Sequence, residues 1–391
     1  MNLHLVNEYS SDNLGDAVIY ESLVQLASPM GVHSTLDLSQ RERIRGLLPG
    51  CRSGAEDLHV SVGGDIFNNA RKYLVTKKFL QNTRLLASRP PRRSFMFGQS
   101  IPESCQGLSF RILCGVLRRL SSVTVRDAQS QRRLVAAGIS AHLSFDIAFA
   151  YRSAARSIDA GRALFEKNGI DAEKCVLVSV RGFNAMYPHD NQLFTEKIAE
   201  LCRLLILRGH HPTVLLQAEV GAGDNDSIIV TELRRRLPQL AVLQPLQVGG
   251  GHHPIDAFAG VIALAHSVVA VRFHTTILRL LAGRHSYNLH YSIKGRDIVE
   301  RLGLPGIDLD SFEPGDAVGE IERSSQMSFD PAPQRESVRS AFEFSVSKAL
   351  AQPWSLQSYD NFKSEGLSNL SMMSNSSIES TSPHLRHGLK Q

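Results

Sequence analysis

Short apolar runs alternate with helical segments along most of this 391-residue chain, and this alternation constrains the fold more than any other feature. Such alternation is typical of βαβ units, which build parallel sheets. In the first half the predicted strands are Leu3–Asn7, Leu58–Val62, Ser94–Phe97, Ser122–Val125 and His142–Phe145. In the second half they are Cys175–Val180, Thr213–Gln217, Ala241–Leu243, Val268–Val271 and Tyr287–His290. We therefore predict an α/β fold with two parallel sheets.

The alternation weakens between the two sets of strands, and this break predicts the domain organisation. Residues 1–150 form an N-terminal Rossmann-like domain, residues 151–172 a linker that contains a helix, and residues 173–352 a C-terminal Rossmann-like domain. A helix predicted at Val338–Ala351, within the last of these ranges, is expected to pack back on the body of the protein. Two such halves with facing strand ends have the GT-B-like arrangement. The serine-rich tail, residues 355–391, has too few aromatic and β-branched residues to form a core, so we expect it to be disordered.

Composition excludes several classes of protein. The chain is 42% hydrophobic and 21% charged, which is ordinary for a globular protein. Its net charge of +5 is spread over many helices without a Lys/Arg run, so no nucleic-acid partner is expected. The charge can be an ordinary, mildly basic surface without a function, or it can favour small anions or an anionic membrane surface. The five cysteines lack a C-x-x-C pair and lie mostly in apolar segments, as in a reducing compartment. Without a signal peptide or a membrane-spanning run, the protein is expected to be cytoplasmic, with peripheral membrane association left open.

The segment Ser267–Ile298 carries the most specific signal for chemistry. Arg272 and His274 flank Phe273 at a strand end, so in an extended chain both side chains point the same way. A helix predicted to start near Thr275 places His274 at a helix N-terminus, which attracts anions. Lys294 follows the next strand, at the same edge of the sheet. The set predicts a phosphate or carboxylate site, although His274 alone could be a structural histidine.

Other charged residues also follow predicted strands. Arg126 and Arg181 come directly after apolar strands, where a charged residue often marks only the solvated end of the strand. Arginine's planar fork suits carboxylate and phosphate better than lysine does. Asp16 follows the first strand and could equally cap the next helix. Gly64 and Asp65 follow another strand, where glycine allows close approach of a ligand.

Common nucleotide and metal motifs are missing. The chain has neither G-x-G-x-x-G nor G-x-x-x-x-G-K-[ST], which argues against dinucleotide and P-loop sites. His252 and His253 are adjacent and have no Cys or acidic partner at ligand spacing. We therefore expect no metal site.

Taken together, the motifs resemble the polysaccharide pyruvyl transferase family over roughly residues 1–305. The matching pieces stand in the same order and at strand ends: Asn13-x-Gly15-Asp16, Gly63-Gly64-Asp65, Phe97-Gly98-Gln99-Ser100-Ile101-Pro102, Val125-Arg126-Asp127, Phe145-Asp146-Ile147-Ala148, Val178-Ser179-Val180-Arg181, Arg272-Phe273-His274 and Tyr291-Ser292-Ile293-Lys294. Phe273 stands where the family often has leucine, and Asp65 where a third glycine is common. Both departures bear on substrate identity more than on chemistry.

The resemblance implies a GT-B-like enzyme that moves pyruvate from phosphoenolpyruvate onto a sugar of an exopolysaccharide or cell-surface glycan, forming a ketal and releasing phosphate. It implies that Arg181, Arg272 and His274 contact phosphoenolpyruvate, and that Arg126 and Lys294 are further active-site residues. The N-terminal residues expected at the substrate site are Asn13, Asp16, Gly64, Asp65, Gln99 and Ser100. No cofactor is expected, and the acceptor is a glycan, free or lipid-linked.

The predicted chemistry assigns one role to each charged group. Protonation of the methylene carbon creates an oxocarbenium-like centre at C2, one sugar hydroxyl attacks it, and a second displaces phosphate. His274 is the candidate acid/base, because an imidazole normally titrates near the working pH. Arg181 and Arg272 hold the carboxylate and phosphate, and Lys294 or Arg126 stabilises the leaving phosphate.

Two alternatives remain open from the residues. The first is a nucleotide-sugar glycosyltransferase of the same fold, against which counts the lack of any glutamate from Gly251 to Val299 to hold a ribose. The second is a non-catalytic glycan-binding protein of the same fold, against which counts the complete set of cations.

Overall fold

The computed structural model describes residues 2–6, 13–31, 33–34, 57–69, 74–184, 187–220 and 224–351. The predicted disordered tail, residues 355–391, lies outside these ranges, as does Cys51. The four described cysteines are buried and free. No helix in the described part of the chain combines the length and the hydropathy needed to cross a membrane.

The first sheet has six strands, all parallel, in the order β2-β1-β3-β4-β5-β6. They are β1 (Asn2–Leu5), β2 (His33–Ser34), β3 (Leu58–Val62), β4 (Ser94–Gln99), β5 (Ser122–Val125) and β6 (His142–Leu143). The chain runs from β1 outward to β2 on one side and then to β3 on the other. The strand order therefore reverses between β1 and β3.

The second sheet also has six parallel strands, in the order β11-β8-β7-β12-β13-β14. They are β7 (Cys175–Ser179), β8 (His211–Leu215), β11 (Ala241–Leu243), β12 (Ser267–Ala270), β13 (Tyr287–His290) and β14 (Gly306–Asp308). Numbered along the chain, this is the 3-2-1-4-5-6 order of dinucleotide-binding folds, and it reverses between β7 and β12. A small antiparallel pair, β9 (Glu219–Val220) and β10 (Asp224–Asn225), lies outside this sheet.

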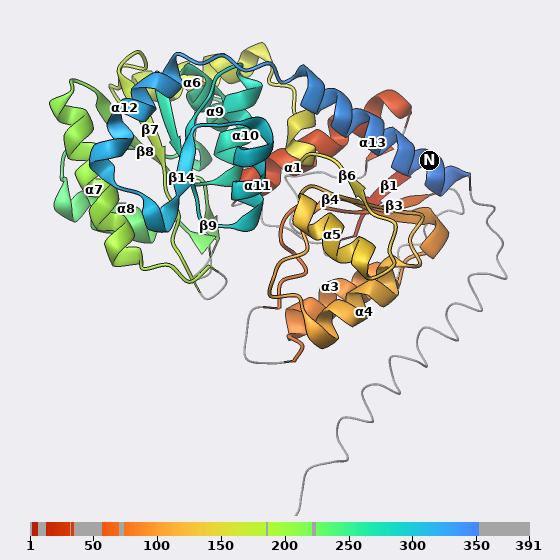
Figure 1. Ribbon diagram of the computed structural model, residues 1–391. Helices are drawn as coiled ribbons and strands as arrows, with labels where there is room; N and C mark the ends of the chain where they lie inside the picture. The colour runs from red at the N-terminus through yellow and green to blue at the C-terminus, as the bar shows by residue number, and fades with distance from the viewer. Residues whose placement is uncertain are drawn as a thin grey trace, which may run out of the picture.

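Helices cover both faces of each sheet (Figure 1). One face of the first sheet carries α1 (Leu14–Ala27) and α13 (Ala332–Leu350), and the other carries α3 (Lys77–Ala87), α4 (Gly107–Leu117) and α5 (Ala128–Ala136). The second sheet is covered by α7 (Asn191–Leu207), α8 (Ser227–Arg236) and α12 (Pro314–Ser325) on one face, and by α6 (Ala155–Lys167), α9 (Pro254–Leu264), α10 (Phe273–Leu281) and α11 (Ile293–Leu302) on the other. The central strands are buried on both faces by mostly apolar side chains, as is usual in parallel sheets, with some buried polar residues such as Ser61 and Gln99 among them.

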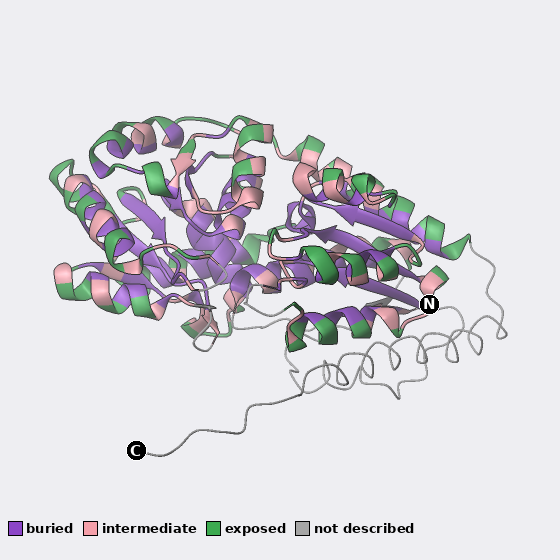
Figure 2. Cartoon of the chain, turned by 60° about the horizontal axis from the view of Figure 1, so that its bottom comes forward, coloured by how far each residue is buried: buried purple, intermediate pink, exposed green. Residues whose placement is uncertain are grey.

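One apolar core runs through the junction of the two domains. Helix α1 packs against α9 and α10, and the buried side chains of these helices join those of both sheets in a single cluster. Figure 2 shows this buried interior as a continuous band between the two halves. The domains therefore meet over a packed interface, which fixes the strand ends on its two sides relative to each other.

Helix α13 crosses back from the second domain to the first. This segment lies within the range predicted for the C-terminal domain, residues 173–352, but the helix packs against β4 and β5 of the first sheet. Phe342 meets Phe97 edge to face, with ring centroids 5.3 Å apart. The apolar side of α13 thus completes the core of the first sheet.

Helix α6, which the sequence analysis places in a linker, packs closely along α9. The contact is made by two glycines, Gly161 and Gly260, whose backbones touch. A Cβ on Gly260 would lie 1.8 Å from the carbonyl oxygen of Ser157, much closer than real Cβ atoms come. Small residues are required at this crossing, because the two helix backbones leave no space for a side chain.

We expect Gly260→Ala to lower the free energy of unfolding by about 1–3 kcal/mol, the usual effect of overpacking a core. Gly319→Ala is the matched control, because Gly319 is exposed within α12 and a Cβ there would meet no atom within 4 Å. That substitution should stabilise the protein slightly, since alanine favours a helix over glycine. Urea unfolding of both variants measures the difference, and equal midpoints would contradict this account of the α6–α9 contact.

Candidate active site

Residues that follow the central strands of both sheets converge at the domain interface. Arg181 and Arg272 follow β7 and β12, the two strands between which the order of the second sheet reverses. In the first sheet, Asp65 follows β3 and Asn13 begins the segment after β1, next to the corresponding reversal. Open parallel sheets bind ligands at such reversals, beyond the carboxyl ends of their strands.

Helix α10 begins at Phe273, two residues earlier than predicted, with Arg272 as its N-cap. The idea that Arg272 and His274 point the same way from an extended chain is therefore wrong. His274 instead lies in the first turn of the helix and is only 8% exposed. Its Nε2 is 3.9 Å from Oδ1 of Asp146 and has no hydrogen-bond partner among the described residues. Buried polar atoms are nearly always paired, so this nitrogen requires a functional explanation.

The N-terminus of α1 holds His274 from the other domain. A Cβ on Gly15 would lie 2.3 Å from Nδ1 of His274, so the imidazole occupies the space that a side chain would take. Asn13 caps this helix by accepting a hydrogen bond from the Gly15 N–H at 3.0 Å. The cap is thus Asn13 and not Asp16, which lies half-buried in the first turn. The adjacent Leu14 N–H donates to the carbonyl oxygen of Gln217, 3.1 Å away in the second domain.

Asp65 joins the two domains through charge. Its carboxylate accepts from Nζ of Lys294 at 2.8 Å and from Nη2 of Arg126 at 3.1 Å, and it also accepts from the hydroxyl of Tyr187. Burial alone would raise the pKa of Asp65, but Lys294 and Arg126 outweigh it and hold that pKa well below its usual range. Asp65 therefore stays ionised and neutralises cations from both domains.

Arg126 is fixed on every side. Its Nη1 donates to Asp146 at 2.5 Å and its Nε to the Ser100 hydroxyl at 2.7 Å, and its guanidinium lies 5.1 Å from the centroid of the Phe273 ring. Burial would lower the pKa of Arg126, but Asp146 and Asp65 raise it, so the side chain remains a cation. Arg126 thus orients Asp65 and also Asp146, the carboxylate that lies 3.9 Å from His274.

Arg272 is the cation of a second buried pair. Its Nη2 donates to Asp226, and its Nε donates to the carbonyl oxygen of Val180 at 3.3 Å. Asp226 also accepts from the N–H groups of Gln217 and Ala218, at 3.1 and 3.0 Å. The guanidinium therefore has a fixed position beside the start of α10.

Arg181 lies between aromatic rings. Its guanidinium carbon is 4.6 Å from the ring centroid of Tyr187 and 5.0 Å from that of Tyr291, and Nη1 donates to the Tyr291 hydroxyl at 2.5 Å. Cation–π contacts of this kind orient an arginine while leaving it charged. Gln99, in contrast, is directed into its own sheet, where it bonds Ser61 and the carbonyl oxygen of Val62 at 3.1 Å each.

Burial lowers the pKa of His274 to about 4, and the cations Arg126, Lys294 and Arg272 add to this effect against Asp146. Two helix N-termini, those of α10 and α1, also disfavour a positive charge at this position. The imidazole is therefore neutral at pH 7. The expectation that its pKa lies near the working pH is wrong for this arrangement of charges, because burial and the neighbouring cations lower it.

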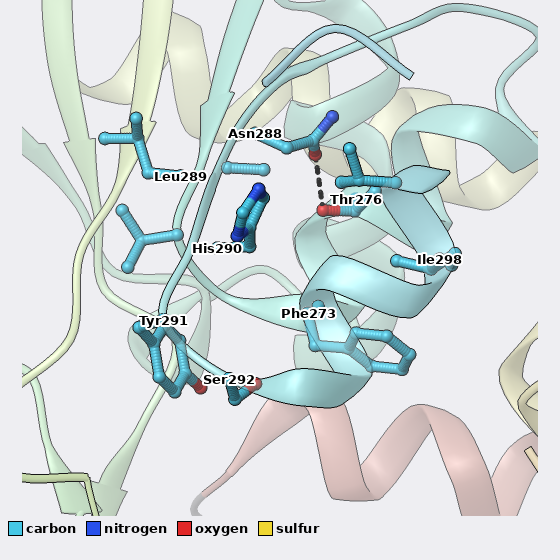
Figure 3. A pocket seen from close by; sticks show the side chains of 12 residues that line it. Phe273, Thr276, Asn288, Leu289, His290, Tyr291, Ser292 and Ile298 are labelled. Carbon is cyan, nitrogen blue, oxygen red and sulfur yellow. Dashed lines mark hydrogen bonds between the residues drawn. The ribbon is translucent and has the colours of Figure 1, made fainter. Parts of the chain in front are cut away.

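A small cavity lies beside this network, between α10, α11 and the end of β13 (Figure 3). Its volume is about 20 Å³, and the Thr276 hydroxyl bonds Asn288 at 2.8 Å on its wall. That volume fits about one water molecule, so this cavity is too small for a substrate.

No group of three His, Cys, Asp or Glu side chains in the described ranges could hold a metal ion. His253 accepts a hydrogen bond from the Ile255 N–H and caps α9.

The structure brings most of the predicted residues to one interface, and it adds four that the sequence analysis missed. Arg126 and Lys294 form one network through Asp65. His274 lies beside it, 3.9 Å from Asp146, and Asn13 lies next to the helix start that contacts His274. The missed residues are Asp146, Asp226, Tyr187 and Gln217. Asp146 was signalled by its motif, Phe145-Asp146-Ile147-Ala148, and Asp226 by a polar loop before a helix. Tyr187 and Gln217 have no comparable sequence signal.

Comparison with known proteins supports the fold and the family. A family model described as Polysaccharide pyruvyl transferase matches residues 13–292, well over half of the chain. A UDP-GlcNAc 2-epimerase from Methanocaldococcus jannaschii is similar in structure, with a TM-score of 0.50 and 9% identity over 88% of this chain and 99% of that one. A putative UDP-N-acetylglucosamine 2-epimerase from Listeria monocytogenes has a TM-score of 0.51 and 9% identity, over 88% and 94%. These likenesses confirm the two-domain α/β, GT-B-like fold. No curated protein sequence matches the chain.

Proposed function

The chain belongs to the polysaccharide pyruvyl transferase family, and from this premise we propose that it moves pyruvate from phosphoenolpyruvate onto a glycan sugar as a ketal. The observation that carries the proposal is the unpartnered Nε2 of buried His274, which lies among cations at the reversal points of two parallel sheets. An uncharged imidazole surrounded by guanidinium and ammonium groups suits a ligand that is strongly anionic and must be protonated.

Phosphoenolpyruvate matches this charge pattern. It carries close to three negative charges on a small skeleton, so several fixed cations are needed to bind it. In this proposal Arg272 and Arg181, which are oriented by Asp226 and by two tyrosines, hold its carboxylate and phosphate. Lys294 and Arg126 stabilise the departing phosphate, and the donor competes with Asp65 for them.

The donor itself prepares His274 for acid catalysis. Negative charge next to an imidazole raises its pKa, so bound phosphoenolpyruvate opposes the burial and the cations that lower it. His274 gives its proton to the methylene carbon, and an acceptor hydroxyl attacks C2 while its proton passes to the imidazole. The second hydroxyl then displaces phosphate, which leaves with that hydroxyl's proton. The acceptor is proposed to lie on the side of Asn13, Asp16 and Gly64, and no metal or cofactor takes part.

We expect phosphoenolpyruvate to bind with uptake of protons near pH 7, because His274 is neutral before binding and charged after it. Calorimetric titration in buffers of different ionisation enthalpy measures the uptake. His274→Gln is the matched variant and should bind phosphoenolpyruvate with correspondingly less uptake. Equal proton uptake by both proteins would contradict the assigned role of His274. Binding of a nucleoside-diphosphate sugar, with none of phosphoenolpyruvate, would instead favour a glycosyltransferase.

The acceptor is identified by turnover. Phosphate release from phosphoenolpyruvate is measured against a panel of glycans, with single sugars that lack one hydroxyl of a reacting pair as controls. Release that depends on a glycan with two suitably placed hydroxyls supports ketal formation. Binding of phosphoenolpyruvate without release on any glycan would support the non-catalytic alternative.

A further inference from the structure

The positive charge of the chain is concentrated in one part of the N-terminal domain. Residues 74–140 contain twelve Lys and Arg and two acids, a net charge of +10, whereas the whole chain has +5. The remaining residues therefore carry a net charge of −5. The prediction that the positive charge is spread over many helices is therefore wrong. The basic residues of this stretch do not form a continuous run in the sequence, so their concentration is visible only when charges are counted over residues 74–140.

The fold gathers these residues into one layer. Helices α3, α4 and α5 cover the same face of the first sheet, and their inner sides bury Phe79, Leu113 and Leu134 in one core cluster. Helices α3 and α4 pack side by side (Figure 1), and the outer side of the layer is exposed (Figure 2). We call this outer side the α3–α5 surface; it includes the turns at the helix ends.

Exposed cations stand on each helix of the α3–α5 surface. On α3 they are Lys77, Lys78 and Arg84. On α4, its end and α5 they are Arg111, Arg118, Arg119 and Arg132. Of the two acids in this stretch, Asp127 is buried as the N-cap of α5, so Glu103 is the one exposed carboxylate of the described residues 74–140.

Aliphatic side chains are exposed between these cations. Leu74, before α3, is 79% exposed, Val135 on α5 is 57% exposed, and Leu80 and Leu108 are each 42% exposed. The aromatic side chains of the layer are directed inward: Phe79 is buried and Phe110 is half-buried beneath Arg133. The surface thus combines positive charge with apolar groups that could enter an interface.

We propose that the α3–α5 surface docks on an anionic lipid bilayer. Basic residues are attracted to anionic headgroups, and exposed leucines gain from burial at the headgroup boundary. A single-stranded nucleic acid would also be attracted to the charge, but it is normally held by exposed aromatic rings, and in this layer the described rings are buried or half-buried. The mixture of cations and aliphatic groups therefore favours lipid.

Docking through the α3–α5 surface would also bring the candidate active site close to the bilayer. Helix α3 follows β3 and runs back along the sheet, so Leu74 and Lys77 lie at the carboxyl edge, the edge that carries Asp65. The acceptor side of the site then lies close to the lipid surface. The docking itself does not depend on the proposed reaction, since charge and exposed leucines drive it.

Flotation of the full chain with vesicles tests the proposal. Vesicles of phosphatidylcholine with phosphatidylglycerol are compared with phosphatidylcholine alone, at low and at high salt. Each basic residue near an anionic surface contributes about fivefold to partitioning, so Lys77→Gln/Lys78→Gln/Arg84→Gln should reduce binding about a hundredfold. The control Arg203→Gln/Arg208→Gln/Arg235→Gln removes the same charge from exposed positions on α7, α8 and the turn after α7, and should bind as the unchanged protein does.

A second variant separates lipid contact from general attraction to polyanions. Leu74→Ser/Leu80→Ser should weaken vesicle binding severalfold without a change in charge, whereas binding to a single-stranded RNA oligonucleotide would not respond. Thermal melts verify that each variant is folded. The proposal is overturned if the unchanged protein ignores anionic vesicles at low salt, if the two charge variants bind equally, or if RNA binds more tightly than the vesicles.

Discussion

Replacing His274 by alanine is expected to lower kcat by about 10²–10⁴-fold, the usual contribution of a general acid–base group, while binding of phosphoenolpyruvate changes much less. The imidazole is buried and its Nε2 has no partner in the described structure, so it contributes little hydrogen-bonding energy to the fold. His274→Ala should therefore lower kcat strongly and change the thermal stability little. Steady-state phosphate release and thermal melts on the same samples measure both effects.

A matched variant displaces His274 without removing it. In Gly15→Ala the new methyl group would lie 2.3 Å from Nδ1 of His274, so the ring must move. A misplaced acid/base group loses rate because proton transfer requires hydrogen-bond distance, so this variant should also lose turnover. If His274 were only structural, His274→Ala would be destabilised and as active per folded molecule as the unchanged protein. That outcome would reject the catalytic assignment.

Replacing Arg272 by alanine should reduce both stability and donor binding. Its loss leaves the buried carboxylate of Asp226 without its cation, and breaking a buried pair in this way typically costs about 3–5 kcal/mol. Donor affinity falls as well, since a charge-assisted contact to an anionic group is lost. Arg272→Lys should rescue little of the affinity, because an ammonium group is a single point of charge and cannot donate two parallel hydrogen bonds to a carboxylate or phosphate as a guanidinium can.

The loss of stability and the loss of donor affinity can be separated by also replacing Asp226, the carboxylate that pairs with Arg272. Arg272→Ala/Asp226→Asn removes the unpaired charge and keeps an oxygen that accepts from the N–H groups of Gln217 and Ala218. This double variant should recover much of the stability and none of the affinity for phosphoenolpyruvate. Unfolding in urea and calorimetric titration give the two quantities. If Arg272→Ala bound phosphoenolpyruvate as well as the unchanged protein, Arg272 would serve the fold alone.

The regular parts of the fold follow from the sequence. The bounds of β3, β5, β11 and β13 agree with the predicted strands, because each is a short segment with apolar or β-branched residues between polar turns. The edge strand β14 was missed because its three residues, Gly306–Asp308, include a single apolar side chain. The sequence also predicts a helix near α13, but its amphipathic pattern does not say which sheet it covers.

The sequence predicts those residues of the site whose position follows from the strand topology alone. Parallel strands bring their carboxyl ends to one edge, so cations after strands of the same sheet, such as Arg272 after β12 and Lys294 after β13, could be expected on one side of it. Their carboxylate partners were not predicted as such. Asp65 meets Lys294 only because the two domains pack together, and Asp226 meets Arg272 through the tertiary packing of the second domain. The lowered pKa of His274 has the same origin, since burial and neighbouring cations arise only in the folded chain.

Helix α13 is synthesised after both sheets, yet it covers a face of the first. While a ribosome makes the chain, Phe95 and Phe97 emerge long before Phe342, the ring that covers them. N-terminal domains generally fold first during synthesis, but here the first domain must wait for a segment beyond the second. The part of the sheet face that α13 covers therefore stays exposed throughout the translation of the second domain. We expect the growing chain to be prone to aggregation at this apolar surface until residues 332–350 are made.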